Sequence, residues 1–225
     1  MTLPAGWVVR RATPDDAPAF SRCYAAAVAL TYAHLMPPEF AEARFAEIDH
    51  VTATVREHIE DGDRARAAGR EPHRTYWVSI DADGEFVGVA SVGPGRDRWD
   101  IEMGHPDPPI LFNLDKIYLL PRAQGSGLGQ AMLDAVLPAR RGAWLWILRD
   151  NDRAEAFYRR NGFIDEPYET TCGDLWFHRP MFRMWRPDPA PPPDITVSTD
   201  APRSDAADYD QTERPVPDAK ARDER

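Results

Sequence analysis

The 225-residue sequence has few cysteines, no long apolar run and no excess of basic residues. Cys23 and Cys172 are far apart and form no C-x-x-C pair, so we expect free thiols rather than a disulfide framework or a zinc ribbon. The six histidines show no ligand spacing, and no metal is expected. Because neither a run of about eighteen apolar residues nor a basic region followed by an apolar one occurs, we expect no membrane span and no secretory signal. A cytoplasmic protein is the prediction.

The formal net charge of −10 is unlike that of a general nucleic-acid binder, which needs a basic face. Half of this charge falls in residues 187–225, which hold ten acidic and five basic side chains and eight prolines. Such a composition buries too little apolar surface to offset the entropy of ordering it. We therefore expect one domain over residues 1–186 and a disordered acidic, proline-rich tail over residues 187–225, with no nucleic-acid or membrane partner.

Strand and helix patterns alternate along the first 186 residues, which indicates a layered α/β domain. Thr13-Pro14-Asp15-Asp16 favours helix initiation, and Asp81-Ala82-Asp83-Gly84 predicts a hairpin turn. Expected strands cover residues 7–11, 75–80, 86–92, 111–119, 145–148 and 175–185, the last paired through 168–172. Expected helices cover residues 14–30, 38–68 and 125–137, and a loop rich in glycine, proline and aspartate covers 93–109.

Residues 119–130 place a glycine-spaced turn between an apolar strand and a helix. Glycine allows positive φ and lets a ligand approach the backbone closely. The first N–H groups of a helix have no intrahelical partner and carry partial positive charge. A turn of this kind at a helix N-terminus is typical of a phosphate site.

Four interpretations of this turn compete, and three of them are considered first. A Walker-type loop is disfavoured, because Gly129 is followed by Gln130 and not by lysine and a hydroxyl residue. A dinucleotide fingerprint has Gly125 and Gly127 in register and Asp150 near the position of the ribose-binding acid, but its third glycine is replaced by Gln130. A glycine-rich helix start without any ligand is the third.

The remaining pattern, Q/R-x-x-G-x-G/A at Gln124, Gly127 and Gly129, resembles the GNAT superfamily of N-acetyltransferases. A second match follows the strand over residues 145–148 and is similar to the family's N-x-x-A-x-x-F-Y helix and G-F exit. Its residues are Asn151, Ala154, Phe157, Tyr158 and Asn161-Gly162-Phe163. The segment over residues 31–37 is similar to the Tyr/Leu/Pro segment between the first two helices of many members. Together these similarities cover most of residues 7–185.

The resemblance implies an α/β fold of the GNAT type, with a mixed, mostly antiparallel central sheet that is flanked by helices and splayed at its fourth and fifth strands. It also implies an N-acetyltransferase that moves an acetyl group from acetyl-CoA to a small-molecule amine or a peptide N-terminus, by direct attack through a tetrahedral intermediate. The residues expected to bind acetyl-CoA are Ile117, Tyr118, Leu119, Gln124, Gly125, Ser126, Gly127, Leu128, Gly129, Gln130, Asn151, Ala154, Phe157 and Tyr158. Backbone amides of the turn would hold the pyrophosphate, and the strand over residues 117–119 would pair with the pantetheine arm.

Tyr158 is the candidate acid that protonates the leaving thiolate. A phenol has an unperturbed pKa near 10 and a thiol near 8.5, so partial proton donation is chemically reasonable. The alternative for Tyr158 is a core aromatic beside Phe157. Asn151 has two roles that do not exclude each other, a hydrogen bond to the pantetheine amides and a helix N-cap.

The general base is the part of the site where the sequence departs from the family. Many members carry a glutamate five positions before the tyrosine aligned with Tyr118, and here that position is Asn113, which cannot take a proton. Asp115, on the same strand face by alternation, and Glu102 are the candidate bases, each with an ordinary surface acid as its alternative. A chain of water molecules and His34 are further options.

Acceptor binding is expected from residues 32–38, from the loop over 93–109 and from the turn near 166–173, with Tyr32, His34 and Asn113 as candidate substrate contacts. The loop acids, Asp97, Asp100, Glu102 and Asp107, would attract a cationic amine or merely solvate the loop. Two other classes stay open, namely an acyl-CoA-binding sensor without turnover, and a nucleotide-binding oxidoreductase, which the late position of the turn opposes. A homodimer is compatible with this prediction.

Overall fold

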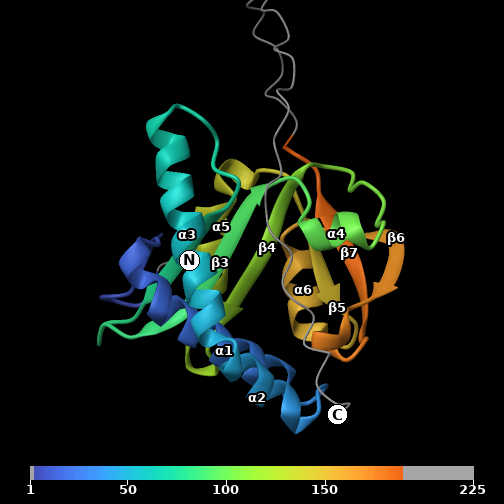
Figure 1. Cartoon of the computed structure of the whole chain (residues 1–225), viewed down its shortest axis with the longest axis horizontal. Coiled ribbons are helices and arrows are strands. Elements are labelled where there is room, and N and C mark those ends of the chain that lie inside the picture. Colours follow the sequence, from blue (N-terminus) through green and yellow to red (C-terminus); the bar gives the residue numbers. More distant parts are fainter. Residues whose placement is uncertain (1–2, 190–225) are drawn as a thin grey trace, which may run out of the picture. The chain divides into compact units, whose positions relative to one another are not determined.

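Seven strands form one mixed sheet in the part of the chain that the structure, a computed structural model, describes, residues 3–189 (Figure 1). They are β1 (Val8–Arg11), β2 (Thr75–Ile80), β3 (Phe86–Pro94), β4 (Phe112–Leu119), β5 (Ala143–Leu148), β6 (Ile164–Thr171) and β7 (Pro180–Arg186), in the order β1-β2-β3-β4-β5-β7-β6. Only β4 and β5 pair in parallel, and the other neighbours are antiparallel. The predicted α/β class and the mostly antiparallel sheet are confirmed.

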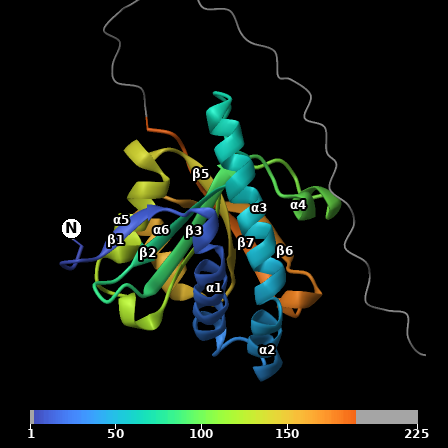
Figure 2. The same ribbon diagram turned by 60° about the vertical axis from the view of Figure 1, so that its left-hand side comes forward.

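Helices cover both faces of this sheet (Figure 2). One face carries α1 (Ala17–Tyr32), α2 (Pro38–Ala46) and α3 (Ile48–Ala67), and the other carries α5 (Leu128–Val136) and α6 (Asp152–Arg160). The largest apolar cluster lies between the sheet and α5, with fully buried Leu128, Met132 and Met184. A short helix, α4 (Arg98–Glu102), lies in the connection from β3 to β4.

The start of α1 is stabilised by the carboxylate of Asp16. This side chain accepts hydrogen bonds from the Thr13 amide (2.7 Å) and from Arg10 (2.6 Å), as the expected capping sequence requires. The Arg10 side chain holds the pKa of Asp16 down at about 2. The helix expected from Pro14 starts as a 3₁₀ turn over Pro14–Asp16, so α1 begins at Ala17, three residues later than predicted, and ends at Tyr32, two residues beyond the prediction.

Several other element boundaries differ from the prediction. The helix expected over residues 38–68 is two helices that meet at Glu47. The helix expected from Gly125 begins at Leu128, because Gly127 has φ +90° and cannot belong to it. The loop expected over residues 93–109 contains α4, and the strand expected from Leu175 begins at Pro180, since Asp174–Trp176 forms a 3₁₀ turn.

The predicted splay between the fourth and fifth strands is present. The parallel pairing of β4 with β5 is limited to Asn113 and Trp144. The Asn113 side chain joins the two strands there, because its Nδ2 donates to the Trp144 carbonyl (3.3 Å) while its Oδ1 accepts from Arg74 (2.9 Å). Beyond this point the strands diverge, so each leaves part of its backbone without a neighbouring strand (Figure 1).

Candidate active site

A cavity of about 490 Å³ occupies the opening between the diverging strands, a size typical of small-molecule sites. Residues 114–119 of β4 and 145–147 of β5 form its walls. Gln124, Gly125, Gly127, Gly129 and Gln130 of the glycine turn and the first turn of α5 line one end. From α6 and its N-cap come Asn151, Arg153, Ala154, Phe157, Tyr158 and Arg160. Of the fourteen residues expected to bind acetyl-CoA, all except Ser126 and Leu128 line this cavity.

The glycine turn places backbone amides at the N-terminus of α5. Gly125 and Gly127 have φ +82° and +90°, a conformation that side-chain-bearing residues rarely adopt. The first helical hydrogen bond runs from the Ala131 amide to the Gly127 carbonyl (3.1 Å), so the amides before Ala131 precede the ladder of α5. Apart from Gly125 and its two chain neighbours, no atom of the described residues lies within 4 Å of the place where a Gly125 side chain would begin. An anion therefore has both donors and room here.

Ser126 and Leu128 support the turn from behind. The Ser126 hydroxyl donates to the Ala123 carbonyl (2.6 Å) and accepts a longer bond from the Leu128 amide (3.3 Å). The Leu128 side chain is fully buried in the core. The Gln124 side chain donates to the Leu119 carbonyl (3.1 Å) and accepts from Arg153, a cation at this end of the cavity. These contacts fix the turn between β4 and α6.

Tyr158 lies on α6 with its ring buried between Phe157 (5.3 Å between ring centres) and Phe163 (5.4 Å). It lines the cavity, and within residues 3–189 no hydrogen bond is made by its hydroxyl. Burial, together with the nearby Tyr32, raises the pKa of Tyr158 well above that of an ordinary phenol. The hydroxyl is thus protonated at neutral pH and free to donate into the cavity.

Asn151 combines two contacts. Its Oδ1 accepts from the Ala154 amide (3.3 Å), which makes it the N-cap of α6. Its Nδ2 donates a longer bond to the Tyr32 hydroxyl (3.4 Å), which lies 3.3 Å from the Tyr118 hydroxyl. Asn151 therefore caps α6 and also lines the cavity.

A β-bulge in β4 places the side chains of Asp115 and Lys116 on the same side of the sheet. Ser91 of β3 faces Lys116 and Val92 faces Leu114, so Asp115 is the extra residue of β4. The Asp115 carboxylate accepts from Ser91 and pairs with the Lys116 ammonium (2.9 Å), which lies over the Tyr24 ring (4.9 Å).

Although burial opposes ionisation of Asp115, the nearby Lys116 and Arg74 charges and the Ser91 hydrogen bond lower its pKa to about 2. Asp115 lines the cavity. It is therefore an ionised but weakly basic group at neutral pH.

Three other predicted site residues do not line the cavity. Glu102 is on exposed α4 and pairs with Arg98 (2.6 Å). His34 is exposed after the end of α1. Asn113 is buried at the point where β4 and β5 part, bonded to Arg74 and Trp144. The structure brings together Tyr158, Asp115 and Tyr32 and leaves these three outside.

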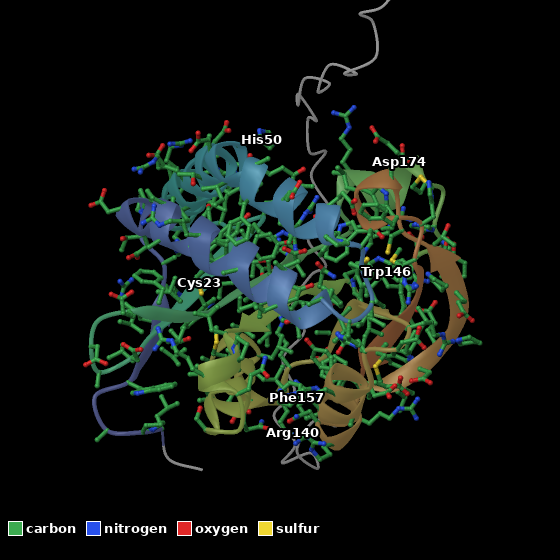
Figure 3. All side chains as sticks on the ribbon, turned by 90° about the horizontal axis from the view of Figure 1, so that it is seen from below. Cys23, His50, Arg140, Trp146, Phe157 and Asp174 are labelled. Carbon is green, nitrogen blue, oxygen red and sulfur yellow. The ribbon has the colours of Figure 1, made fainter. Side chains whose placement is uncertain are left out.

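The other end of the cavity is aromatic, and the sequence analysis missed part of it. Tyr32, Tyr118 and Trp146, which we call the aromatic end, pack in the cluster beside α1 and α2. Phe157 packs against the apolar cluster between the sheet and α5. Both Phe157 and Trp146 are labelled in Figure 3. Trp146 lies between Leu145 and Ile147 along β5. Because successive side chains of a strand point to opposite faces of the sheet, this alternation predicts that Trp146 faces away from the side to which Leu145 and Ile147 point. Lys116 and Arg153 were missed as well, because no motif includes them.

A mixed sheet that opens between its fourth and fifth strands, with a glycine turn and a helix N-terminus at the opening, defines a GNAT-type acetyltransferase fold. The family comparison agrees: the model described as "Acetyltransferase (GNAT) family" matches residues 40–163. The chain belongs to the GNAT acetyltransferase family. This membership confirms the resemblance drawn from the two motifs.

Curated relatives are also N-acetyltransferases. An uncharacterised N-acetyltransferase of Mycobacterium tuberculosis is 33% identical over 147 residues, which are 62% of this chain and 80% of the relative. A type 1 aminoglycoside N(6′)-acetyltransferase of Stenotrophomonas maltophilia is 36% identical over 110 residues, 47% of this chain and 66% of the relative.

Among solved structures, the PaiA N-acetyltransferase of Thermoplasma acidophilum in complex with coenzyme A has a TM-score of 0.55 at 17% identity and covers 80% of this chain and 98% of its own. Identity at this level supports the fold alone.

Among residues 3–189 no three histidine, cysteine, aspartate or glutamate side chains are grouped to hold a metal ion. None of the helices described is both long enough and apolar enough to cross a bilayer.

Proposed function

We propose that this protein transfers the acetyl group of acetyl-CoA to an amine, either a small molecule or a peptide N-terminus, by direct attack through a tetrahedral intermediate. One observation carries the proposal: a single cavity joins the amides of the glycine turn to the Tyr158 hydroxyl. We further propose that it acts in the cytoplasm.

The residues at the glycine-turn end fit the phosphates of acetyl-CoA. Positive φ at Gly125 and Gly127, the open space beside Gly125 and the helix N-terminus together favour a pyrophosphate. Arg153 and Arg160 add positive charge at the same end. The pantetheine arm, which carries amides, would bond to the backbone of residues 117–119, because β4 has no strand partner on that side beyond Asn113.

The chemistry requires a donor for the oxyanion and a proton for the leaving thiolate. We assign the first role to the Leu119 amide or a neighbour on β4, since backbone N–H groups fixed in place stabilise developing negative charge. We assign the second to Tyr158, whose phenol remains protonated because its pKa is raised. Ser126 and Leu128 would act only by holding the turn.

Deprotonation of the amine is assigned to water rather than to a side chain. Asp115 has a depressed pKa because of Lys116 and Arg74, so it holds a proton poorly. Glu102 pairs with Arg98 outside the cavity. An amine that reaches the site would therefore lose its proton to solvent before it attacks the thioester.

Thermal shift with acetyl-CoA, NAD and ATP tests the ligand class. At 100 times its Kd, acetyl-CoA should stabilise the fold by about 2.7 kcal/mol, which raises Tm by roughly 5–10 °C for a domain of this size. No shift with any CoA ester would refute the proposal, and a shift with NAD alone would favour an oxidoreductase. Thiol release in the presence of an amine panel then separates an enzyme from an acyl-CoA sensor, which would bind without turnover.

A further inference from the structure

Three acidic side chains of the connection from β3 to β4 are already paired. Asp97 bonds to buried Arg74, Asp107 pairs with Arg96 (3.1 Å), and Glu102 pairs with Arg98 (2.6 Å). The expectation that these loop acids attract a cationic amine has no support in these contacts. Asp115, the carboxylate of the cavity lining, pairs with Lys116, so its charge is not available to an acceptor.

Asp100 has a different role from the other loop acids. It is 2% exposed, and its Oδ1 accepts from the indole N–H of Trp146 (2.7 Å). Its Oδ2 accepts from the Asp97 amide (3.2 Å) and so caps α4. The bond from α4 to β5 fixes the plane of a ring that lines the cavity.

Neighbouring rings hold Trp146 from the side away from the cavity. Trp99 lies edge-on to it (6.2 Å between ring centres, 76°), His105 lies 5.2 Å away, and the guanidinium of buried Arg183 lies 5.3 Å from its centre. A ring with this many partners cannot turn freely, so it presents a fixed apolar surface to the acceptor.

We propose that Trp146 selects acceptors that carry an apolar or aromatic group beside a single amine, and that Asp100 is the positioning residue that sets the Trp146 ring. This inference rests on the proposed N-acetyltransferase function. A polycationic amine is disfavoured, because the Asp115 carboxylate is neutralised by Lys116 and the three acids of the connection from β3 to β4 named above each have a basic partner.

The test compares three acceptors, 2-phenylethylamine, ethanolamine and spermidine, with acetyl-CoA in excess. The wild-type protein should have the highest kcat/KM for 2-phenylethylamine. Trp146→Ala should lower that value by about tenfold, the equivalent of one lost aromatic contact, and change the value for ethanolamine by less than about threefold. The KM for acetyl-CoA should stay constant.

Asp100 is tested by a double-mutant cycle with Trp146→Phe, which keeps an aromatic ring but has no N–H to donate. Asp100→Leu should raise the KM for 2-phenylethylamine in the wild-type background and have no further effect beside Trp146→Phe. Asp100→Asn keeps an acceptor oxygen and should retain most of the preference. Ile101→Ala, on the exposed side of the same helix, is the matched control.

The outcomes separate this inference from the proposed function. A higher kcat/KM for spermidine, or an equal loss for all three acceptors in Trp146→Ala, would overturn the inference while leaving N-acetyl transfer intact. Additive effects in the cycle would remove the positioning role of Asp100. If no amine releases thiol while acetyl-CoA still raises Tm, the transferase function itself fails, and the inference fails with it.

Discussion

Replacing Tyr158 by phenylalanine removes one hydroxyl and leaves the ring. The ring contacts with Phe157 and Phe163 are kept, and within residues 3–189 the hydroxyl makes no hydrogen bond whose partner would be left behind. We therefore expect the free energy of unfolding to change by less than about 0.5 kcal/mol. If the phenol is the acid, kcat should fall by about 10²- to 10⁴-fold, the range for lost general acid catalysis.

Thiol release from acetyl-CoA, followed with a chromogenic disulfide reagent, measures this effect. The protein's own thiols should contribute little, because burial raises the pKa of Cys23 to about 12 and that of Cys172 to about 11. The raised pKa of Tyr158 also predicts that wild-type kcat shows no loss of the acid below about pH 10. A Tyr158→Phe variant that binds acetyl-CoA normally and turns over within threefold of wild type would refute the acid assignment.

Three further perturbations follow from the structure. Gly127→Ala should raise the KM for acetyl-CoA at least about tenfold and cost about 1–2 kcal/mol in urea unfolding, because φ is +90° there; an unchanged KM would contradict a phosphate role for the turn. Asp16→Asn should lower stability at pH 7 by about 2 kcal/mol. A depressed carboxyl pKa stabilises the fold above the unfolded value and loses this effect as the pH falls through the folded value, so the variant should respond less to acid between about pH 4 and about pH 2. Cys23 and Cys172 should react with iodoacetamide at pH 8 only after unfolding, as mass spectrometry of the labelled protein would report.

The part of the cavity that we propose for the cofactor was predictable from the sequence, because the residues that line it lie in two short motifs. The spacing of Gln124, Gly127 and Gly129 depends on local backbone geometry, which the sequence encodes directly. Asn151 and Tyr158 stand seven positions apart on a single helix, so they face the same side of it. Residues of both motifs therefore line the same cavity in the folded chain.

The acceptor half depends on contacts between distant segments. Alternation predicted the strand face of Asp115, but the bulge that turns Lys116 to the same side has no glycine or other local sign. The bond from Asp100 to Trp146 joins residues 46 positions apart. A local signal for α4 did exist, since Asp97 and Asp100 have the spacing of a capping box.

Asn113, which replaces the expected glutamate, is the point from which β4 and β5 diverge. The segment of β4 from Asn113 to Leu119 extends about 20 Å beyond the last residue that pairs with β5, and β3 pairs with it along this length. A rotation of β3 and β4 together by about 3° relative to β5 at Asn113 therefore moves Leu119 by about 1 Å, a displacement large enough to cost about two orders of magnitude in rate. Mutations at Arg74, which bonds to Asn113 but does not line the cavity, would therefore act on the reaction through the relative position of β4 and β5.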